Sequence, residues 1–169
     1  CRRARLMRNH QELLALTIAF VKKKLAGAEG GHDWFHTERV LKTARIIARA
    51  EAAQLIVVEL GALLHDIADS KFHKGDESIG PALARDFLES IEVEREIADH
   101  VVKIIENVSF GGGVEKERFS SLELAVVQDA DRLDALGAIG IARTFNYGGY
   151  KGRELYNPEV PQVTYGSKE

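Results

Sequence analysis

Two adjacent ionisable residues interrupt an apolar stretch of the sequence, "GALLHDIADSKFHKG" over 61–75. His65 and Asp66 follow Leu63 and Leu64, which belong to the apolar face of a predicted helix. Successive residues of a helix point about 100° apart, so a contiguous His-Asp pair is a poor way to build one flat polar surface. We therefore expect something to be held between these two side chains.

Further ionisable side chains lie on or beside the apolar faces of two other predicted helices. His36 falls on the same helical stripe as Val40 and Ala44, and Asp129 and Asp131 follow the apolar run of a later helix. Burying several such groups is costly unless they pair or bind a cation. Imidazoles and carboxylates together form a mixed N/O set that suits Mn²⁺, Fe²⁺, Co²⁺, Ni²⁺ or Zn²⁺. The sequence thus predicts a divalent metal site shared by three helices.

Each of these residues also has a simpler interpretation. A lone histidine on an apolar helix face is more often a core residue whose hydrogen bonds are satisfied, and Asp129 or Asp131 alone could cap a helix or pair with Arg132 or Arg39. The coincidence of such residues on three helices favours the metal site. Two residues of separation place Asp129 and Asp131 about 200° apart on a helix, so they cannot both face the ion equally, and the spacing leaves open which one does.

The spacing of apolar residues predicts an all-α bundle with the metal site between its helices. Ser120 to Glu123 has the spacing of a capping box, so the sixth helix is expected to start near Ser120. Pro81 is acceptable only in the first turn of its helix, and Gly137 and Gly140 interrupt or lighten the last helical piece. No alternation typical of strands occurs in the sequence. The predicted helices are 11–25, 33–53, 55–68, 77–90, 92–108 and 120–136, followed by the piece "AIGIARTF" over 138–145.

Length and composition favour a soluble protein of one domain. The chain has 169 residues, enough to bury a core, and a net charge of −3 without a long basic run, so stable nucleic-acid binding is not expected. Its single cysteine, Cys1, excludes an intramolecular disulfide and suits a reducing, cytoplasmic compartment. The longest apolar stretch, 13–21, is too short to cross a bilayer, so no membrane association is expected.

Three segments resemble the HD-domain metal-dependent phosphohydrolases: "HDWFHTERV" with His36, "ALLHDIADSKF" with His65 and Asp66, and "VVQDADRLDALGAIGIAR" with Asp131. The resemblance covers about residues 30–157 and looks closest to the small bacterial HD hydrolases, some of which are nucleoside-triphosphate pyrophosphohydrolases. It implies a single HD domain over 1–169 with its core at 30–157. Related proteins typically continue with further helical sequence, so the C-terminal part is expected to be incomplete.

The resemblance also implies a ligand set and a metal. The motif "ADRL" around Asp131 matches the ligand-bearing segment of related HD enzymes, so Asp131 is favoured as the last ligand and Asp129 is the second choice. One divalent ion is expected, with Mn²⁺ favoured over Mg²⁺, Fe²⁺, Co²⁺, Ni²⁺ or Zn²⁺ and with water or a phosphate oxygen in the remaining positions. A second ion would need ligands such as His32, His73 and His100, but these form no closely spaced cluster. The implied ligands are His36, His65, Asp66 and Asp131.

Asp66, Asp69 and Lys71 are the candidates for catalysis. Asp69 is placed to accept a proton from the attacking water or to orient it, and Lys71 could hold a phosphate oxygen as a point charge. The simpler interpretations are an exposed carboxylate at a helix end and a solvated lysine at a helix C-terminus.

The substrate is expected to contact cationic and aromatic residues. Arg39, three residues after His36, projects from nearly the same face and could contact phosphate or pair with Asp66 or Asp129. Arginine binds phosphate with two parallel hydrogen bonds, and tyrosine can stack on a base. An ordinary surface role remains open for each residue. The candidates are Arg39, His100, Arg143, Tyr147 and Lys151.

These expectations combine into a nucleotide phosphohydrolase. A metal lowers the pKa of water and screens the negative phosphate, and the first expectation is hydrolysis of a nucleoside triphosphate to a monophosphate and pyrophosphate. The alternatives are a nucleotide phosphomonoesterase, a cyclic-nucleotide phosphodiesterase, a nucleotide-sensing module without turnover, and a purely structural helical bundle. The expected partner is a phosphorylated small molecule, and assembly as a homodimer is left open.

Overall fold

The computed structural model describes residues 8–27, 33–67, 78–108 and 119–159. These ranges contain seven α-helices and no strand, so the predicted all-α fold is confirmed. None of the helices in the described ranges is long and apolar enough to cross a membrane. The helices are α1 (His10–Lys24), α2 (Trp34–Ala50), α3 (Leu55–Leu64), α4 (Ile79–Ser90), α5 (Arg95–Val108), α6 (Leu122–Leu133) and α7 (Gly137–Tyr150).

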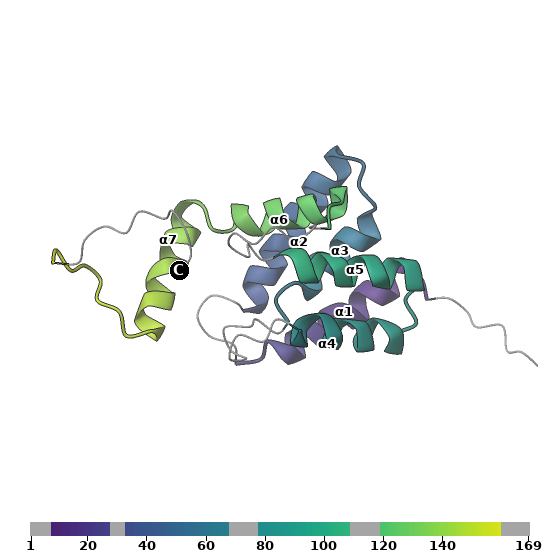
Figure 1. The fold of residues 1–169 in the computed structure, drawn as a ribbon, viewed down its shortest axis with the longest axis horizontal. Helices are drawn as coiled ribbons and strands as arrows, with labels where there is room; N and C mark the ends of the chain where they lie inside the picture. The colour runs from purple at the N-terminus through teal and green to yellow at the C-terminus, as the bar shows by residue number, and fades with distance from the viewer. Residues whose placement is uncertain (1–7, 28–32, 68–77, 109–118, 160–169) are drawn as a thin grey trace, which may run out of the picture.

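Helix α3 is the centre of the bundle formed by α1 to α6 (Figure 1). Residues 57–64 are all buried, and a helix that is apolar on every side is stable only in an interior. α1, α2, α5 and α6 all contact it. At Gly61 a Cβ would lie 3.3 Å from Ile104 and 3.4 Å from Val127, so the glycine allows α5 and α6 to approach closely. The C-terminal end of α3 therefore delivers His65 to the interior.

Glu59 is the acidic exception within α3. Its carboxylate is buried and accepts a hydrogen bond of 2.6 Å from Nε of Arg45 on α2, and it also contacts Nε2 of His10 on α1. A buried carboxylate is costly unless it is paired and hydrogen-bonded. The Glu59 cluster therefore joins three helices without contributing to the candidate metal site.

α6 begins two residues later than predicted, and its N-cap lies one residue later. Ser121, not Ser120, caps the helix: its Oγ accepts the backbone N–H of Leu124 at 3.1 Å. The carboxylate of Glu123 accepts the backbone N–H of Gln54, just before α3, at 3.0 Å. The predicted capping box is therefore wrong, because Glu123 bonds to a segment that is distant in sequence.

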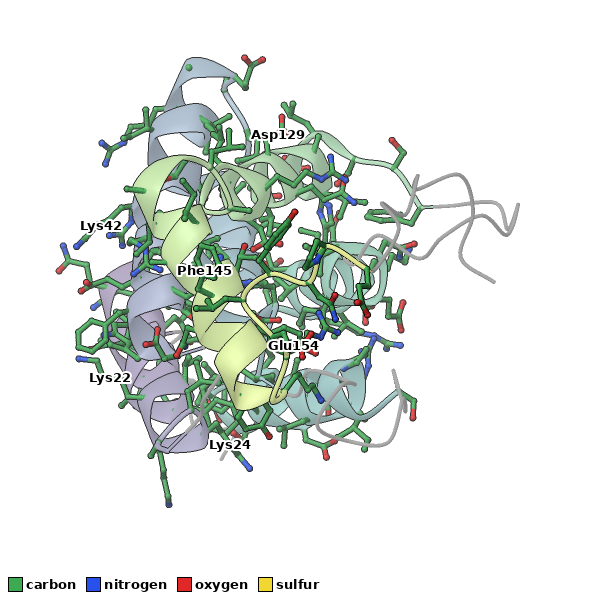
Figure 2. The ribbon with its side chains drawn as sticks, turned by 90° about the vertical axis from the view of Figure 1, so that its left-hand side faces the viewer. Lys22, Lys24, Lys42, Asp129, Phe145 and Glu154 are labelled. Atoms are coloured by element: carbon green, nitrogen blue, oxygen red, sulfur yellow. The ribbon has the colours of Figure 1, made fainter. Side chains whose placement is uncertain are left out.

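Two helix ends near the site also differ from the prediction. α3 ends at Leu64 instead of 68, with residues 65–67 in a turn, and α6 ends at Leu133 instead of 136. The piece expected at 138–145 is a longer helix, α7, which stands to one side of the other helices in Figure 1. Figure 2 views the molecule from the α7 side and labels Phe145, whose side chain is exposed.

The connection between α6 and α7 depends on two glycines. Gly137 adopts φ +65°, a conformation that favours glycine. A Cβ on Gly140 would lie 2.0 Å from the carbonyl oxygen of Ala135, so only glycine permits this approach. The two residues that were expected to weaken a helix therefore allow the chain to turn tightly into α7. Pro81 lies in the first turn of α4, as predicted.

Candidate metal centre

His36 lies in the first turn of α2, where the side chain of Asp33 caps the helix by accepting the backbone N–H of His36 at 2.9 Å. The imidazole is buried, and its Nδ1 donates to Oδ2 of Asp134 at 2.7 Å. A carboxylate can only accept this hydrogen bond, so the proton resides on Nδ1. When the ring is neutral, the lone pair of Nε2 is available to a cation.

His65 follows the last residue of α3, and its ring also carries its proton on Nδ1, but the acceptor is a backbone oxygen instead of a carboxylate. Its Nδ1 donates to the carbonyl oxygen of Ala62 at 2.8 Å. The Nε2 atom is buried and makes no hydrogen bond within the described ranges. The ring centres of His36 and His65 lie 5.4 Å apart, and the angle between the two ring planes is 69°. Both histidines thus turn Nε2 toward a shared position.

Two carboxylates lie close to these nitrogens. Oδ1 of Asp131 is 3.3 Å from Nε2 of His36 and 3.7 Å from Nε2 of His65. Oδ2 of Asp66 is 3.6 Å and 3.7 Å from the same two atoms. His36, His65 and Asp131 offer ligand atoms within 4.8 Å of one another and could hold a metal ion. Two ligands each about 2.1 Å from one ion, at near-tetrahedral angles, are roughly 3.4 Å apart, so these separations fit a shared cation.

The charges of the cluster shift the pKa values of its members. Burial by itself lowers the pKa of His36, but the hydrogen bonds to Asp131 and Asp134 outweigh burial and raise it above the usual value. Burial by itself raises the pKa of Asp131, yet the hydrogen bond to His36 and the charge of His65 lower it. These carboxylates therefore attract positive charge to the position between the two histidines.

Asp134, the residue after α6, carries three positive or proton-donating partners. Besides His36, it accepts hydrogen bonds from Nε of Arg39 at 2.6 Å, Nη2 of Arg39 at 3.0 Å and Nη1 of Arg143 at 2.9 Å. The pKa of Asp134 is lowered because the Arg39 and His36 hydrogen bonds outweigh the effect of burial, which alone would raise it. Arg39 thus pairs with Asp134 and not, as considered from the sequence, with Asp66 or Asp129.

The structure separates the two aspartates that the spacing left open. Asp131 contributes to the cluster, whereas the side chain of Asp129 is 64% exposed and lies 3.8 Å from Arg132. Figure 2 labels Asp129 on the outside of the bundle. The geometry therefore favours Asp131 over Asp129 as a ligand.

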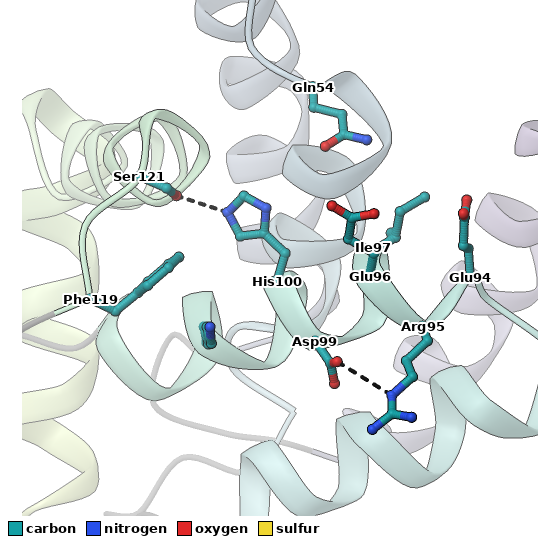
Figure 3. Close-up of a pocket in the computed structure, with 10 residues that line it drawn as sticks. Gln54, Glu94, Arg95, Glu96, Ile97, Asp99, His100, Phe119 and Ser121 are labelled. Carbon is teal, nitrogen blue, oxygen red and sulfur yellow. Dashed lines mark hydrogen bonds and ion pairs between the residues drawn. The ribbon is translucent and has the colours of Figure 1, made fainter.

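His100 lies at a different pocket, shown in Figure 3. Its Nε2 is 2.9 Å from Oγ of Ser121, and its ring meets that of Phe119 edge to face. The pocket has a volume of about 730 Å³, and its lining includes none of the four candidate ligands. The sequence made His100 a candidate for contact with the substrate, and that role stays a prediction.

Tyr147 and Lys151 lie on α7 and at its C-terminal end. Nζ of Lys151 stands 5.7 Å from the ring centre of Tyr147, and the guanidinium of Arg153 stands 5.6 Å from the same ring. Tyr147 and Lys151 thus lie close to each other, whereas the third candidate of this segment, Arg143, binds Asp134; contact of these residues with a substrate stays a prediction. Four other predicted residues lie outside the described ranges: His32, Asp69, Lys71 and His73.

Sequence reasoning did not identify Asp134. The residue lies three positions after Asp131, within reach of the same helical face, and this spacing was the available signal. Its partners His36 and Arg39 lie 98 and 95 residues away, so no local pattern could have revealed them.

Comparison with known proteins gives the family. Residues 34–136 match the HD domain family. The chain belongs to the HD-domain family. It is 42% identical to the uncharacterized protein YpgQ of Bacillus subtilis over 142 residues, which cover 83% of this chain and 68% of YpgQ.

Solved structures agree with this assignment. An HD-superfamily hydrolase from Bacillus thuringiensis is 45% identical, with a TM-score of 0.70 over 90% of this chain and 73% of that chain. YpgQ in complex with ADP is 36% identical, with a TM-score of 0.72 over 89% of this chain and 72% of that chain. The HD domain described here is therefore a hydrolase of the metal-dependent phosphohydrolase class.

Proposed function

We propose that this HD domain hydrolyses nucleoside triphosphates to nucleoside monophosphates and pyrophosphate. The observation that carries the proposal is that two buried histidines, each donating a hydrogen bond from Nδ1, turn Nε2 toward one position. The carboxylates of Asp66 and Asp131 lie beside that position, and two arginines bind the neighbouring Asp134. The crystallised complex of YpgQ with ADP supports a nucleotide as the ligand class.

The proposed ligands are His36, His65, Asp66 and Asp131, and the proposed ion is Mn²⁺. A divalent ion held by these residues would lower the pKa of water and screen the charge of the phosphate groups. The ligand set contains two nitrogen and two carboxylate donors and no thiolate, which suits Mn²⁺ among other divalent cations.

The charge balance of the described site favours an anionic substrate. The carboxylates of Asp66, Asp131 and Asp134 exceed the guanidinium groups of Arg39 and Arg143 by one. A divalent cation would change this balance to one positive charge, which attracts a polyphosphate. The metal therefore contributes to binding as well as to chemistry.

The remaining roles continue the predictions from the sequence. Asp69 accepts a proton from the attacking water, and Lys71 holds a phosphate oxygen. Tyr147 and Lys151 contact the base and the outer phosphates from α7. A cytoplasmic location, where nucleotides are abundant, belongs to the same proposal.

Product analysis with isotopic water tests the reaction directly. The protein, stripped of metal and then loaded with Mn²⁺, is incubated with a panel of nucleoside triphosphates, monophosphates and cyclic nucleotides in H₂¹⁸O. Attack at the α-phosphorus places one ¹⁸O in the nucleoside monophosphate, whereas attack at the β-phosphorus places it in pyrophosphate. We expect the first result and no orthophosphate.

Two variants frame the assay. Asp66→Ala should lower turnover at least about 100-fold. Loss of a residue that only hydrogen-bonds to a metal ligand typically lowers activity by about 10- to 100-fold, and loss of a ligand itself should lower it at least as much. Asp129→Asn, a change at an exposed aspartate, should retain the wild-type rate. Release of orthophosphate from a nucleoside monophosphate would indicate a phosphomonoesterase. A linear monophosphate formed from a cyclic nucleotide would indicate a phosphodiesterase. Nucleotide binding without turnover in any divalent metal, unchanged in Asp66→Ala, would establish a sensing module instead.

A further inference from the structure

We propose that Asp134 is the positioning residue of the metal centre: it orients His36 for metal binding and, through Arg143, couples helix α7 to that centre. This inference rests on the proposed metal-dependent function and adds a residue that touches neither the metal nor the substrate. It also gives Arg39 and Arg143 a role that differs from direct contact with phosphate.

The first step is the saturation of the Asp134 carboxylate. Oδ1 accepts Nε of Arg39, while Oδ2 accepts Nδ1 of His36, Nη2 of Arg39 and Nη1 of Arg143, all at 2.6–3.0 Å. The side chain is only 6% exposed. A carboxylate held by two guanidinium groups at this depth has little freedom to rotate. Asp134 is therefore a rigid acceptor for the imidazole.

The second step concerns what this acceptor does to His36. The hydrogen bond keeps the proton on Nδ1, directs Nε2 toward Asp131 and Asp66, and increases the basicity of the ring as a ligand. His65 needs no such carboxylate because the carbonyl oxygen of Ala62, within the same turn of chain, accepts its Nδ1–H. The orientation of His36 thus depends on a contact between α2 and the end of α6, whereas that of His65 is local.

The third step brings in α7. Arg143 lies three residues after Gly140, whose lack of a Cβ permits the close approach to Ala135. This turn directs Arg143 back toward Asp134, and the Arg143 side chain is 19% exposed although most of α7 is exposed. Arg143 thereby helps to hold the carboxylate that holds His36. α7 contributes to the metal centre through Asp134 without supplying a ligand.

Metal affinity, measured without substrate, tests this role. Metal-free protein is titrated with Mn²⁺ by calorimetry in the wild type, Asp134→Asn and the control Asp129→Asn, an aspartate of α6 that also pairs with an arginine. We expect Asp134→Asn to weaken Mn²⁺ binding by about 10- to 100-fold and Asp129→Asn to leave it unchanged. With Co²⁺ in place of Mn²⁺, the visible absorption spectrum should change in Asp134→Asn alone, because it reports the geometry of the ligands.

A double-mutant cycle separates positioning from phosphate binding by Arg143. If Arg143 acts through Asp134, Arg143→Gln weakens Mn²⁺ binding in the wild type but has no further effect in the Asp134→Asn background. If Arg143 only binds phosphate, Arg143→Gln raises KM and leaves Mn²⁺ affinity unchanged, which would overturn the coupling to α7. Arg143→Gln also keeps the test decisive should Asp134→Asn fail to fold.

The outcomes distinguish this inference from the proposed function. A wild-type protein that binds no divalent metal would overturn both. A wild type that binds Mn²⁺ and an Asp134→Asn variant that binds it equally well, with an unchanged Co²⁺ spectrum, would overturn the positioning role of Asp134 and leave the proposed function standing.

Discussion

The two histidines of the site show how one residue type reaches the same chemical state by two routes. Nδ1 of His36 is bound by a carboxylate 98 residues away, whereas Nδ1 of His65 is bound by a carbonyl oxygen three residues earlier. In each case Nε2 faces the carboxylates of Asp66 and Asp131. Asp134 differs from both histidines, because its side-chain partners come from two other helices: His36 and Arg39 from α2, and Arg143 from α7.

The two neighbouring aspartates of α6 give a matched pair of variants at this scale. Asp131→Asn should weaken Mn²⁺ binding by at least about 10-fold, because it removes a carboxylate 3.3 Å from Nε2 of His36. Asp129→Asn, two residues away and exposed, should bind Mn²⁺ as the wild type does. Titration calorimetry measures both, and the reverse ranking would show that Asp129 is the ligand.

Contacts at helix ends connect elements of this fold that are distant in sequence. Glu123, in the first turn of α6, accepts the backbone N–H of Gln54, just before α3. It thereby joins α6, which carries Asp131, to the helix that His65 and Asp66 follow. Burial by itself raises the pKa of Glu123, but the backbone N–H groups of Gln54 and Glu123, together with His100, lower it below the usual value. The ionised form of Glu123 therefore stabilises the folded chain.

We expect Glu123→Gln to lower the free energy of unfolding by about 1–2 kcal/mol at pH 7, since a hydrogen bond to a charged acceptor is weakened. The pKa of Glu123 is lower in the folded state than in the unfolded state, so its contribution is present above the unfolded value and is lost as pH falls through the folded one. The difference between wild type and variant should therefore shrink in acid.

Urea unfolding of both proteins between pH 7 and pH 3 measures this difference. Glu38→Gln is the control, because Glu38 forms an exposed ion pair with Lys42 one turn later on α2, and such pairs contribute about 0–1 kcal/mol. A difference between wild type and Glu123→Gln that stays constant with pH would contradict the assigned role.

At the scale of the whole molecule, the candidate centre joins α2, the turn after α3, and α6. His36 and Asp131 come from helices that are far apart in sequence, and α2, α3 and α6 contact one another in the bundle. A cation that needs ligands from α2, from the turn after α3 and from α6 can bind only to the folded chain. Metal binding should therefore stabilise the entire fold.

Removal of metal should lower the melting temperature. At a free Mn²⁺ concentration about 100 times the Kd, binding adds about 2.7 kcal/mol, which corresponds to roughly 5–10 °C for a chain of this size. Calorimetric scans with Mn²⁺ and with chelator measure the shift. The double variant His36→Gln/His65→Gln should melt at the same temperature in both conditions, and a wild type that does so would support the structural bundle instead.

Several predictions at this scale remain predictions. They are the single-domain organisation over 1–169, the homodimer that was left open and the cytoplasmic location. The chain covers 68% of the length of YpgQ, so the architecture of that relative includes sequence outside the comparison.

The sequence by itself determined the all-α fold and most helix positions, because the 3.6-residue period of apolar side chains is a local property of the chain. It also singled out His36, His65 and Asp66, since ionisable residues beside apolar faces need a reason to be there, whereas the preference for Asp131 over Asp129 came from the resemblance to the HD-domain family. Only the tertiary structure decided which atoms these residues present to one another. It also showed that Asp134 holds Arg39 and Arg143 and that Glu123 bonds to Gln54. Such pairings depend on how helices dock, and the docking angle and the positions of helix ends are set by contacts between segments up to 98 residues apart.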